Sequence, residues 1–225
     1  SRGGGVGGEE DLYAAEKSAA PVKDLLAELV ARNSGIGPML VLSDADGRSL
    51  PHTRIFAYAD GAARYFGFTR EPVGGVTDDV RARMRVRIAG ELYDVIEEEH
   101  LGAADKTYEL TVHPGRGRVF SVLPYRVQDV ELQLDRDELE AGEMLRFTAR
   151  VVPRGGKAGS HAFVARLVRP DGTSERYHRF TLRAPSGFVS GQRFLPFNAP
   201  PGRWQLRVKD AASGKSARAA FVVQE

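Results

Sequence analysis

The stretch RARMRVRIAG, residues 81–90, carries an arginine at every second position, with small or apolar residues between them. Because successive side chains of a β-strand point to opposite faces, one face of this strand is guanidinium and the other apolar. Such a face is either a binding surface for a polyanion or the solvated side of a half-buried strand. The arginines are Arg81, Arg83, Arg85 and Arg87, and the residues between them are Ala82, Met84, Val86 and Ile88.

The stretch that follows, ELYDVIEEE, favours the solvated strand. If Ala89 and Gly90 form a two-residue hairpin turn, Arg85 lies opposite Asp94 and Arg81 lies opposite Glu98. Opposite charges directly across an antiparallel pair stabilise it by about 0.2–1 kcal/mol. The sequence therefore predicts a hairpin with ion pairs on its outer face, and no nucleic-acid partner.

Short β-type runs extend outward from this stretch, and turn signals such as Asp-Gly and Pro-Gly separate them. Seven runs fall within residues 36–127 and seven more within residues 128–225. Strands at this spacing predict a mostly β chain with two tandem antiparallel, Ig-like β-sandwiches. The two domains meet in LPYRVQD at 123–129, where one strand leads directly into the next domain.

The first 35 residues have a different character. Residues 1–20 open with five glycines in eight positions and predict a flexible N-terminal segment. Residues 21–35 carry apolar side chains at helical spacing after Pro21, and predict a short helix leading into the first sandwich. Because the chain begins at Ser1 without an initiator methionine or a signal peptide, we expect a processed chain or a fragment of a longer protein.

Composition narrows the function classes. The 225 residues are 42% hydrophobic and 28% charged, which is ordinary for a globular protein. The net charge of +2 is nearly balanced and does not by itself imply a polyanionic partner. The absence of cysteine excludes disulfides, thiolate metal sites and cysteine nucleophiles. No apolar run reaches the ~18 residues of a membrane span.

Patterns that carry catalysis in other proteins are incomplete here. Ser190 in GFVSG stands at the fourth position, whereas a nucleophile elbow has serine at the third. The carboxylates at 97–99, next to His100, alternate sides of a strand and do not converge. Asp44 and Asp46 begin like a calcium loop that lacks its later ligands. We therefore predict no enzyme activity, no metal and no cofactor. The five histidines lack metal-ligand spacing and are interpreted as surface or turn residues: His52, His100, His113, His161 and His178.

Exposed aromatic side chains are what a carbohydrate-binding surface would need. Trp204 alternates with Leu206 and Val208 in GRWQLRV, and this pattern favours a place in the core for its ring. The candidate binding residues are Trp204, Tyr177 and Tyr125, with Phe188 and Phe197 as further aromatics.

Residues 91–127, ELYDVIEEEHLGAADKTYELTVHPGRGRVFSVLPYRV, resemble a segment near the C-terminus of large multidomain proteins related to beta-galactosidase-type glycoside hydrolases. That segment pairs a YDV…LG strand and turn with a closing LPYRV strand. Residues 25–50 and 60–71 resemble the helix and strand that precede it, so the resemblance covers residues 21–127. Residues 200–223 are similar to the last two strands of Ig-like or macroglobulin-like modules.

The resemblance implies an accessory region, because the catalytic carboxylates of such hydrolases lie on a barrel domain and no (β/α) pattern is present here. The leading hypothesis is a non-catalytic β-sandwich region of a larger carbohydrate-active protein. It would support inter-domain packing or oligomerisation, with other domains or subunits of that protein as partners. Two alternatives stay open: a carbohydrate-binding module with a polysaccharide partner, and an Ig-like structural protein of the envelope or adhesion type. An extracellular or cell-envelope location is the expectation.

Overall fold

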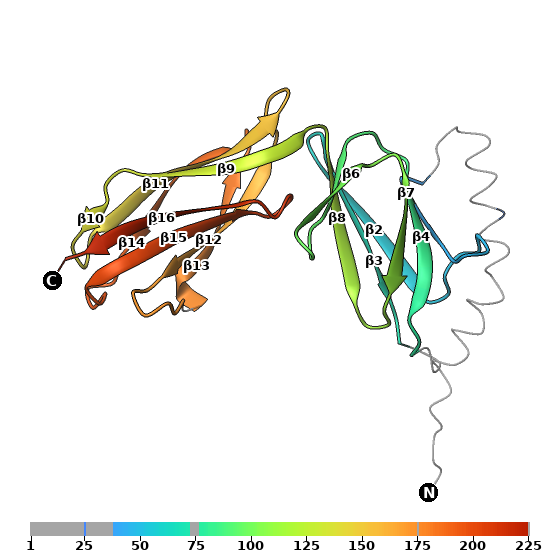
Figure 1. Ribbon diagram of the computed structural model, residues 1–225, viewed down its shortest axis with the longest axis horizontal. Helices are drawn as coiled ribbons and strands as arrows, with labels where there is room; N and C mark the ends of the chain where they lie inside the picture. The colour runs from blue at the N-terminus through green and yellow to red at the C-terminus, as the bar shows by residue number, and fades with distance from the viewer. Residues whose placement is uncertain (1–24, 26–37, 73–76, 175, 225) are drawn as a thin grey trace, which may run out of the picture. The chain divides into compact units, whose positions relative to one another are not determined.

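The computed structural model describes Leu25 and residues 38–72, 77–174 and 176–224. The unit Leu40–Glu225 is built from β-strands (Figure 1). The prediction of a mostly β chain with antiparallel sandwiches is confirmed. The segment predicted at 1–20 and the helix predicted at 21–35 lie, apart from Leu25, outside the described residues. No described helix is long and apolar enough to cross a membrane.

The first sandwich places a three-stranded sheet, β1-β4-β7, against a five-stranded sheet, β2-β3-β8-β5-β6. Side chains from both sheets form its core, in which Phe66 stacks on Phe120 and Met84 is fully buried. The strands are β1 (Leu40–Ser43), β2 (Thr53–Asp60), β3 (Ala63–Arg70), β4 (Val80–Val86), β5 (Glu91–Asp94), β6 (Glu99–Ala103), β7 (Thr107–Val112) and β8 (Gly117–Leu123).

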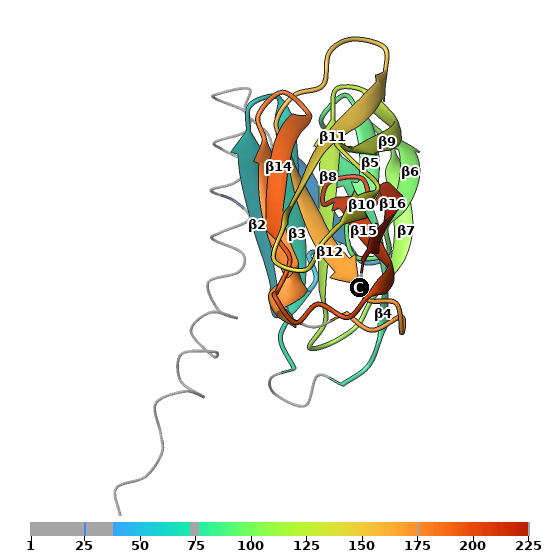
Figure 2. The same ribbon diagram turned by 90° about the vertical axis from the view of Figure 1, so that its left-hand side faces the viewer.

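The second sandwich places β14-β11-β9 against β10-β16-β15-β12-β13. The β10 strand lies beside β16 and runs parallel to it, while the other pairs are antiparallel (Figure 2). Trp204 stacks on Phe221 at the centre of this core. The strands are β9 (Arg126–Leu134), β10 (Glu138–Leu139), β11 (Met144–Arg154), β12 (His161–Val168), β13 (Arg179–Ala184), β14 (Phe188–Phe194), β15 (Gly202–Asp210) and β16 (Ser216–Val223), with a 3-10 turn, η1 (Arg176–His178), before β13.

The hairpin predicted between β4 and β5 is wrong. The β4 strand pairs with β1 and β7, whereas β5 pairs with β6 and β8 in the opposite sheet. The chain crosses between the sheets at Gly90, which has φ 145°. A Cβ at that position would lie 2.5 Å from the carbonyl oxygen of Leu123. The Ala-Gly dipeptide therefore marks a crossover that passes close to β8 and is not a two-residue turn.

The predicted alternation of buried and exposed residues along β4 is confirmed, although β4 pairs with other strands than predicted. Met84 and Val86 are buried, while the four arginines are exposed. Arg83 lies opposite Glu109 of β7, and Arg83 Nε is 3.9 Å from the Glu109 carboxylate. Arg85 lies opposite Thr107 and not Asp94. The arginine face is therefore the solvated side of a half-buried sheet.

Each sandwich has eight strands in the described residues, one more than predicted. The charged run interpreted as a strand end contains a turn and then β6. Glu98 makes that turn possible with a left-handed φ of 58°. The other missed strand, β10, is only two residues long. Both were overlooked because neither has enough alternating apolar residues to give a period-2 signal.

Candidate functional site

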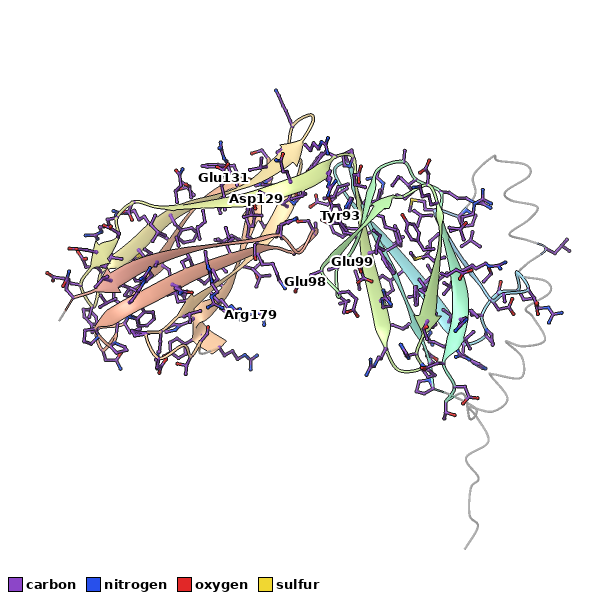
Figure 3. The ribbon with its side chains drawn as sticks, in the orientation of Figure 1. Tyr93, Glu98, Glu99, Asp129, Glu131 and Arg179 are labelled. Carbon is purple, nitrogen blue, oxygen red and sulfur yellow. The ribbon has the colours of Figure 1, made fainter. Side chains whose placement is uncertain are left out.

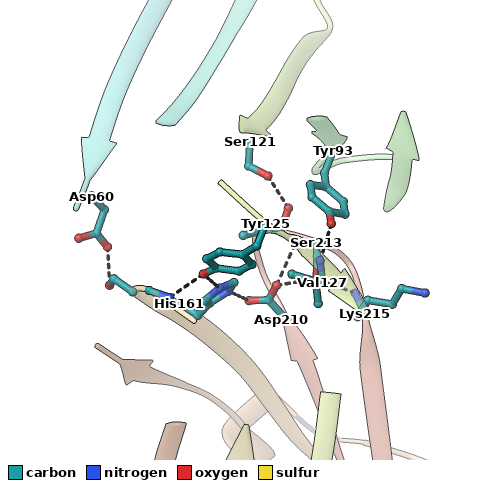
Figure 4. A network of polar contacts seen from close by, with 12 residues as sticks. Asp60, Tyr93, Ser121, Tyr125, Val127, His161, Asp210, Ser213 and Lys215 are labelled. Carbon is teal, nitrogen blue, oxygen red and sulfur yellow. Dashed lines mark hydrogen bonds and ion pairs between the residues drawn. The ribbon is translucent and has the colours of Figure 1, made fainter. Parts of the chain in front are cut away.

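Polar side chains gather where the two sandwiches join (Figure 4). Only Pro124 and Tyr125 separate β8 from β9. The core around Trp204 continues through this region to Tyr93 and Leu123 of the first sandwich. The junction is therefore buried, and each polar group in it needs a partner from the protein.

A chain of three buried side chains runs through the junction. The hydroxyl of Tyr125 lies 2.7 Å from Nε2 of His161, and Nδ1 of His161 lies 2.8 Å from Oδ1 of Asp210. The backbone N–H of Gly159 donates to the Tyr125 oxygen at 2.7 Å, so the phenol hydrogen is directed to the imidazole. With the phenol donating to Nε2, the ring nitrogen left to donate to the Asp210 carboxylate is Nδ1.

The Asp210 carboxylate is the end of this chain and is fully buried. Its Oδ2 accepts hydrogen bonds from the backbone N–H of Ser213 at 2.9 Å and from the Ser213 hydroxyl at 2.5 Å. With His161 on Oδ1, three donors surround one carboxylate. This arrangement fixes the turn between β15 and β16 to the start of β12.

Burial also affects the two tyrosines of the junction. It raises the pKa of Tyr125, although the hydrogen bond from Gly159 acts in the opposite direction. Burial likewise raises the pKa of Tyr93, against the effect of the Val127 N–H, which donates to its oxygen at 2.7 Å. Both phenols therefore stay protonated and keep these hydrogen bonds at neutral pH.

Further contacts tie the first sandwich to the second. The Ser121 hydroxyl on β8 donates to the carbonyl of Ala212 at 2.6 Å. The Ser160 hydroxyl donates to Oδ2 of Asp60 at 2.7 Å, at the exposed edge of the junction. Together with the bond between Tyr93 and Val127, these hydrogen bonds involve three different strands of the first sandwich, β2, β5 and β8.

The turn that contains Glu98 packs against the turn between β15 and β16 (Figure 3). The Glu98 carboxylate forms an ion pair with Lys209. Gly214 lies beneath it with φ 74°, and a Cβ there would come 2.6 Å from Glu98 Cβ. The close approach of the two backbones therefore requires glycine at this position.

Alkaline pH is expected to destabilise the protein through Tyr65 on β3. Burial, assisted by the charges of Asp210 and Asp60, raises the pKa of Tyr65 to about 12. The unfolded phenol ionises near ~10. The stability from the neutral folded phenol is therefore complete below about pH 10 and is lost as the pH rises towards about 12.

We expect the free energy of unfolding to fall by roughly 1–2 kcal/mol over that window because of Tyr65, after allowance for its partial exposure. Urea unfolding followed by far-UV circular dichroism at the two ends of the window measures it. Tyr65→Phe should show a smaller fall than the wild type. An equal fall in the variant would contradict this assignment.

The order tyrosine, histidine, aspartate has the form of a proton relay, but its location does not suit catalysis. His161 and Asp210 side chains are fully buried, and Tyr125 is 8% exposed. A substrate atom has no approach to a group whose donors and acceptors are already bonded to protein. Over the described residues, no group of three metal-binding side chains is present either. The chain of hydrogen bonds fixes the junction.

The structure does not bring the predicted aromatic candidates together. Trp204 is fully buried and Tyr125 lies in the junction, so neither ring can stack on a sugar. Tyr177, in η1, is 50% exposed. The interpretation of the histidines as surface or turn residues is wrong for two of them, because His161 and His178 are buried.

A signal for His161 was present in the sequence. His161 begins the run HAFVARLV, and the period of two along a strand places it on the same face as Phe163 and Leu167, the largest apolar side chains of its first seven residues. Its partner Asp210 ends β15 on the inner face of that strand, in line with Trp204. Their meeting depends on the register between the two strands, which the sequence does not contain.

Comparison with known proteins finds limited similarity. No family model matches the chain. An alpha-2-macroglobulin of Xylella fastidiosa (strain Temecula1) is 33% identical over 90 residues, which are 40% of this chain and 5% of that protein. The chain therefore spans about one twentieth of the length of this curated relative.

Solved structures with similar strands include the Yersinia pseudotuberculosis adhesin InvE, at 12% identity and TM-score 0.34, covering 83% of this chain and 54% of the adhesin. A beta-glycosidase from Bacteroides vulgatus is 12% identical with TM-score 0.29, covering 77% of this chain and 25% of the glycosidase.

Proposed function

We propose that this chain is a non-catalytic β-sandwich region of a larger protein, in which the two sandwiches act as one rigid support for neighbouring domains or subunits. The observation that carries the proposal is the pair of buried hydrogen bonds that cross from one sandwich to the other, Ser121 to Ala212 and Val127 to Tyr93. The chain from Tyr125 through His161 to Asp210 fixes the linker residue Tyr125 to the second sandwich. A hinge between mobile domains is commonly polar and wet. This junction instead has a continuous apolar core, and the side chains of Tyr125, His161 and Asp210 are buried in it.

Buried polar networks of this kind favour a single arrangement. Any rotation of one sandwich would separate Ser121 from Ala212 and Tyr93 from Val127, and each broken bond would leave a buried donor or acceptor unsatisfied. The apolar contacts around Tyr93 would be lost at the same time. Both costs oppose hinge motion.

The resemblance of residues 91–127 to a region of glycoside hydrolases supports a carbohydrate-active parent protein. In that setting the catalytic carboxylates would belong to another domain, and this chain would supply packing surfaces. The buried titratable side chains of the junction, Tyr125, His161 and Asp210, support the same role, because they hydrogen-bond to one another and not to solvent.

Nitrogen-15 relaxation tests the rigid support directly. We expect amides of both sandwiches to give one rotational correlation time, because the junction bonds hold them as a single body. The double variant Ser121→Ala/Tyr93→Phe removes two of those bonds and should allow the two halves to tumble with separate correlation times. Two separate correlation times in the wild type would contradict the proposal.

A panel of nitrophenyl glycosides tests the non-catalytic part. The chain should release nitrophenol no faster than buffer does. Hydrolysis that disappears in the Asp210→Asn variant, with the fold retained, would instead identify the junction as an active site.

A further inference from the structure

Four arginines form one row across the outer face of the five-stranded sheet of the second sandwich. Arg179 of β13 lies opposite Arg166 of β12, and Arg166 lies opposite Arg207 of β15. Arg207 lies in turn opposite Arg218 of β16. Because neighbouring strands are about 4.8 Å apart, the row extends over about 14 Å. We name this row the arginine ladder.

The ladder is unfavourable for the fold, because like charges directly opposite each other destabilise a strand pair. Two exposed arginines of other sheets do face acids. Arg83 faces Glu109, and Arg150 faces Glu131 at 2.7 Å. In the part of the chain that the structure describes, no carboxylate lies within 4.0 Å of the four ladder arginines. A row of like charges that has no partner acid among the described residues, and that is kept at a cost to the fold, is what a binding site for an anion requires.

The ladder lines a groove of about 860 Å³. Arg176 and Lys209 add two further cations to its wall, and Ser174 and Ser216 contribute hydroxyl groups. Glu98 is the one acid among the described lining residues, and it is already paired with Lys209. The groove therefore has a strong excess of positive charge. Arg179 is one of the lining residues and is labelled in Figure 3.

One ladder side chain is oriented in advance by a neutral group. Nε and Nη2 of Arg207 donate to Oε1 of Gln205 at 3.2 and 3.0 Å. The amide holds the guanidinium without cancelling its charge. An acid at position 205 would have neutralised it.

We propose that the arginine ladder binds a linear anionic glycan through carboxylate or sulfate groups carried on successive sugars. The planar fork of a guanidinium donates two parallel hydrogen bonds to such oxyanions. Cations in a row can each meet one of the charges spaced along a linear polymer. A cluster of cations that converge on one point would instead bind a single anion. The strand spacing is close to the length of one pyranose ring, so each arginine can meet the charge of one sugar.

Two other polyanions fit the groove less well. Single-stranded nucleic acids bind grooves that add aromatic platforms for their bases, and the described lining residues include no aromatic ring. An extended acidic peptide presents carboxylates on one face at every second residue, about 6.7 Å apart, which does not match the strand spacing. The groove therefore favours the glycan.

Fluorescence anisotropy with labelled oligosaccharides tests the proposal. The probes are alginate, which carries carboxylates, chondroitin sulfate, which carries both groups, and neutral dextran. We expect the acidic probes to bind, dextran not to bind, and the affinity to fall between about 50 and 200 mM salt. Arg166→Gln/Arg179→Gln should weaken binding about tenfold. The matched control Arg81→Gln/Arg85→Gln removes two exposed strand arginines from the first sandwich and should change it less than about twofold.

Several outcomes would overturn the proposal. These are no binding of either acidic glycan, equal weakening by both double variants, or tighter binding of a thymidine oligonucleotide or poly-glutamate than of the glycans. Thermal unfolding supplies a second readout. Because Arg166→Gln/Arg179→Gln relieves like-charge repulsion, its melting temperature should rise. If the variant is more stable and still binds more weakly, the loss of binding cannot come from unfolding. A lower melting temperature would contradict the claim that repulsion between the ladder arginines destabilises the fold.

Discussion

Asp210→Ala is expected to lower the free energy of unfolding by about 3–5 kcal/mol. The substitution leaves three buried donors without their acceptor, Nδ1–H of His161 and the N–H and hydroxyl of Ser213. It also ends the hydrogen-bond chain that holds Tyr125, so the effect should extend across the junction. Urea unfolding followed by far-UV circular dichroism measures the loss.

Asp171→Ala is the matched control for this variant. Asp171 also accepts hydrogen bonds from the backbone N–H and hydroxyl of a nearby residue, Thr173, but it lies on the exposed turn after β12. Water can replace the lost carboxylate there, so the variant should be much less destabilised. Equal losses in the two variants would show that burial at the junction contributes nothing.

Asp94→Ala is expected to have an effect of similar size, about 3–5 kcal/mol, in the first sandwich. Asp94 is 1% exposed and holds three neighbours. Its Oδ1 accepts from the N–H groups of Ile96 and Glu97 at 3.0 Å each, and its Oδ2 forms an ion pair with Arg118. Removing it leaves two turn amides and a guanidinium without their acceptor.

Glu131→Ala provides the comparison for Asp94. Glu131 also pairs with an arginine on a neighbouring strand, Arg150, but the two side chains are 42% and 60% exposed. Exposed pairs contribute about 0.2–1 kcal/mol, so this variant should remain near the wild type. Chemical denaturation of both variants under the same conditions makes the comparison. If Asp94→Ala behaved like Glu131→Ala, the buried pair would not be a main support of the first sandwich.

The sequence predicts local structure well, because alternation and turn dipeptides are local signals. The inner and outer faces of β4 follow from RARMRV alone, and the core position of Trp204 follows from its alternation with Leu206 and Val208. The strands that pair with β4 could not be predicted from this stretch, because the pairing depends on the crossover at Gly90. A local pattern does not tell a hairpin turn from a crossover between sheets.

The candidate sites were harder to predict for the same reason. The arginine ladder takes one residue from each of four strands between 166 and 218, and only the registers place them in one row. The junction joins His161 to Asp210, which are 49 residues apart in the chain. A stripe within one strand, such as that at 81–87, is visible in the sequence, whereas a row across strands is not.

We propose that the two sandwiches behave as one body held by the junction. Trp204 is the single tryptophan of the chain and lies in the second sandwich, so its fluorescence reports on that sandwich alone. Urea unfolding of Asp94→Ala, which alters only the first sandwich, tests the claim most directly. If the sandwiches unfold together, the Trp204 transition shifts to lower urea and coincides with the transition in circular dichroism. An unchanged Trp204 transition, with circular dichroism split into two steps, would contradict it.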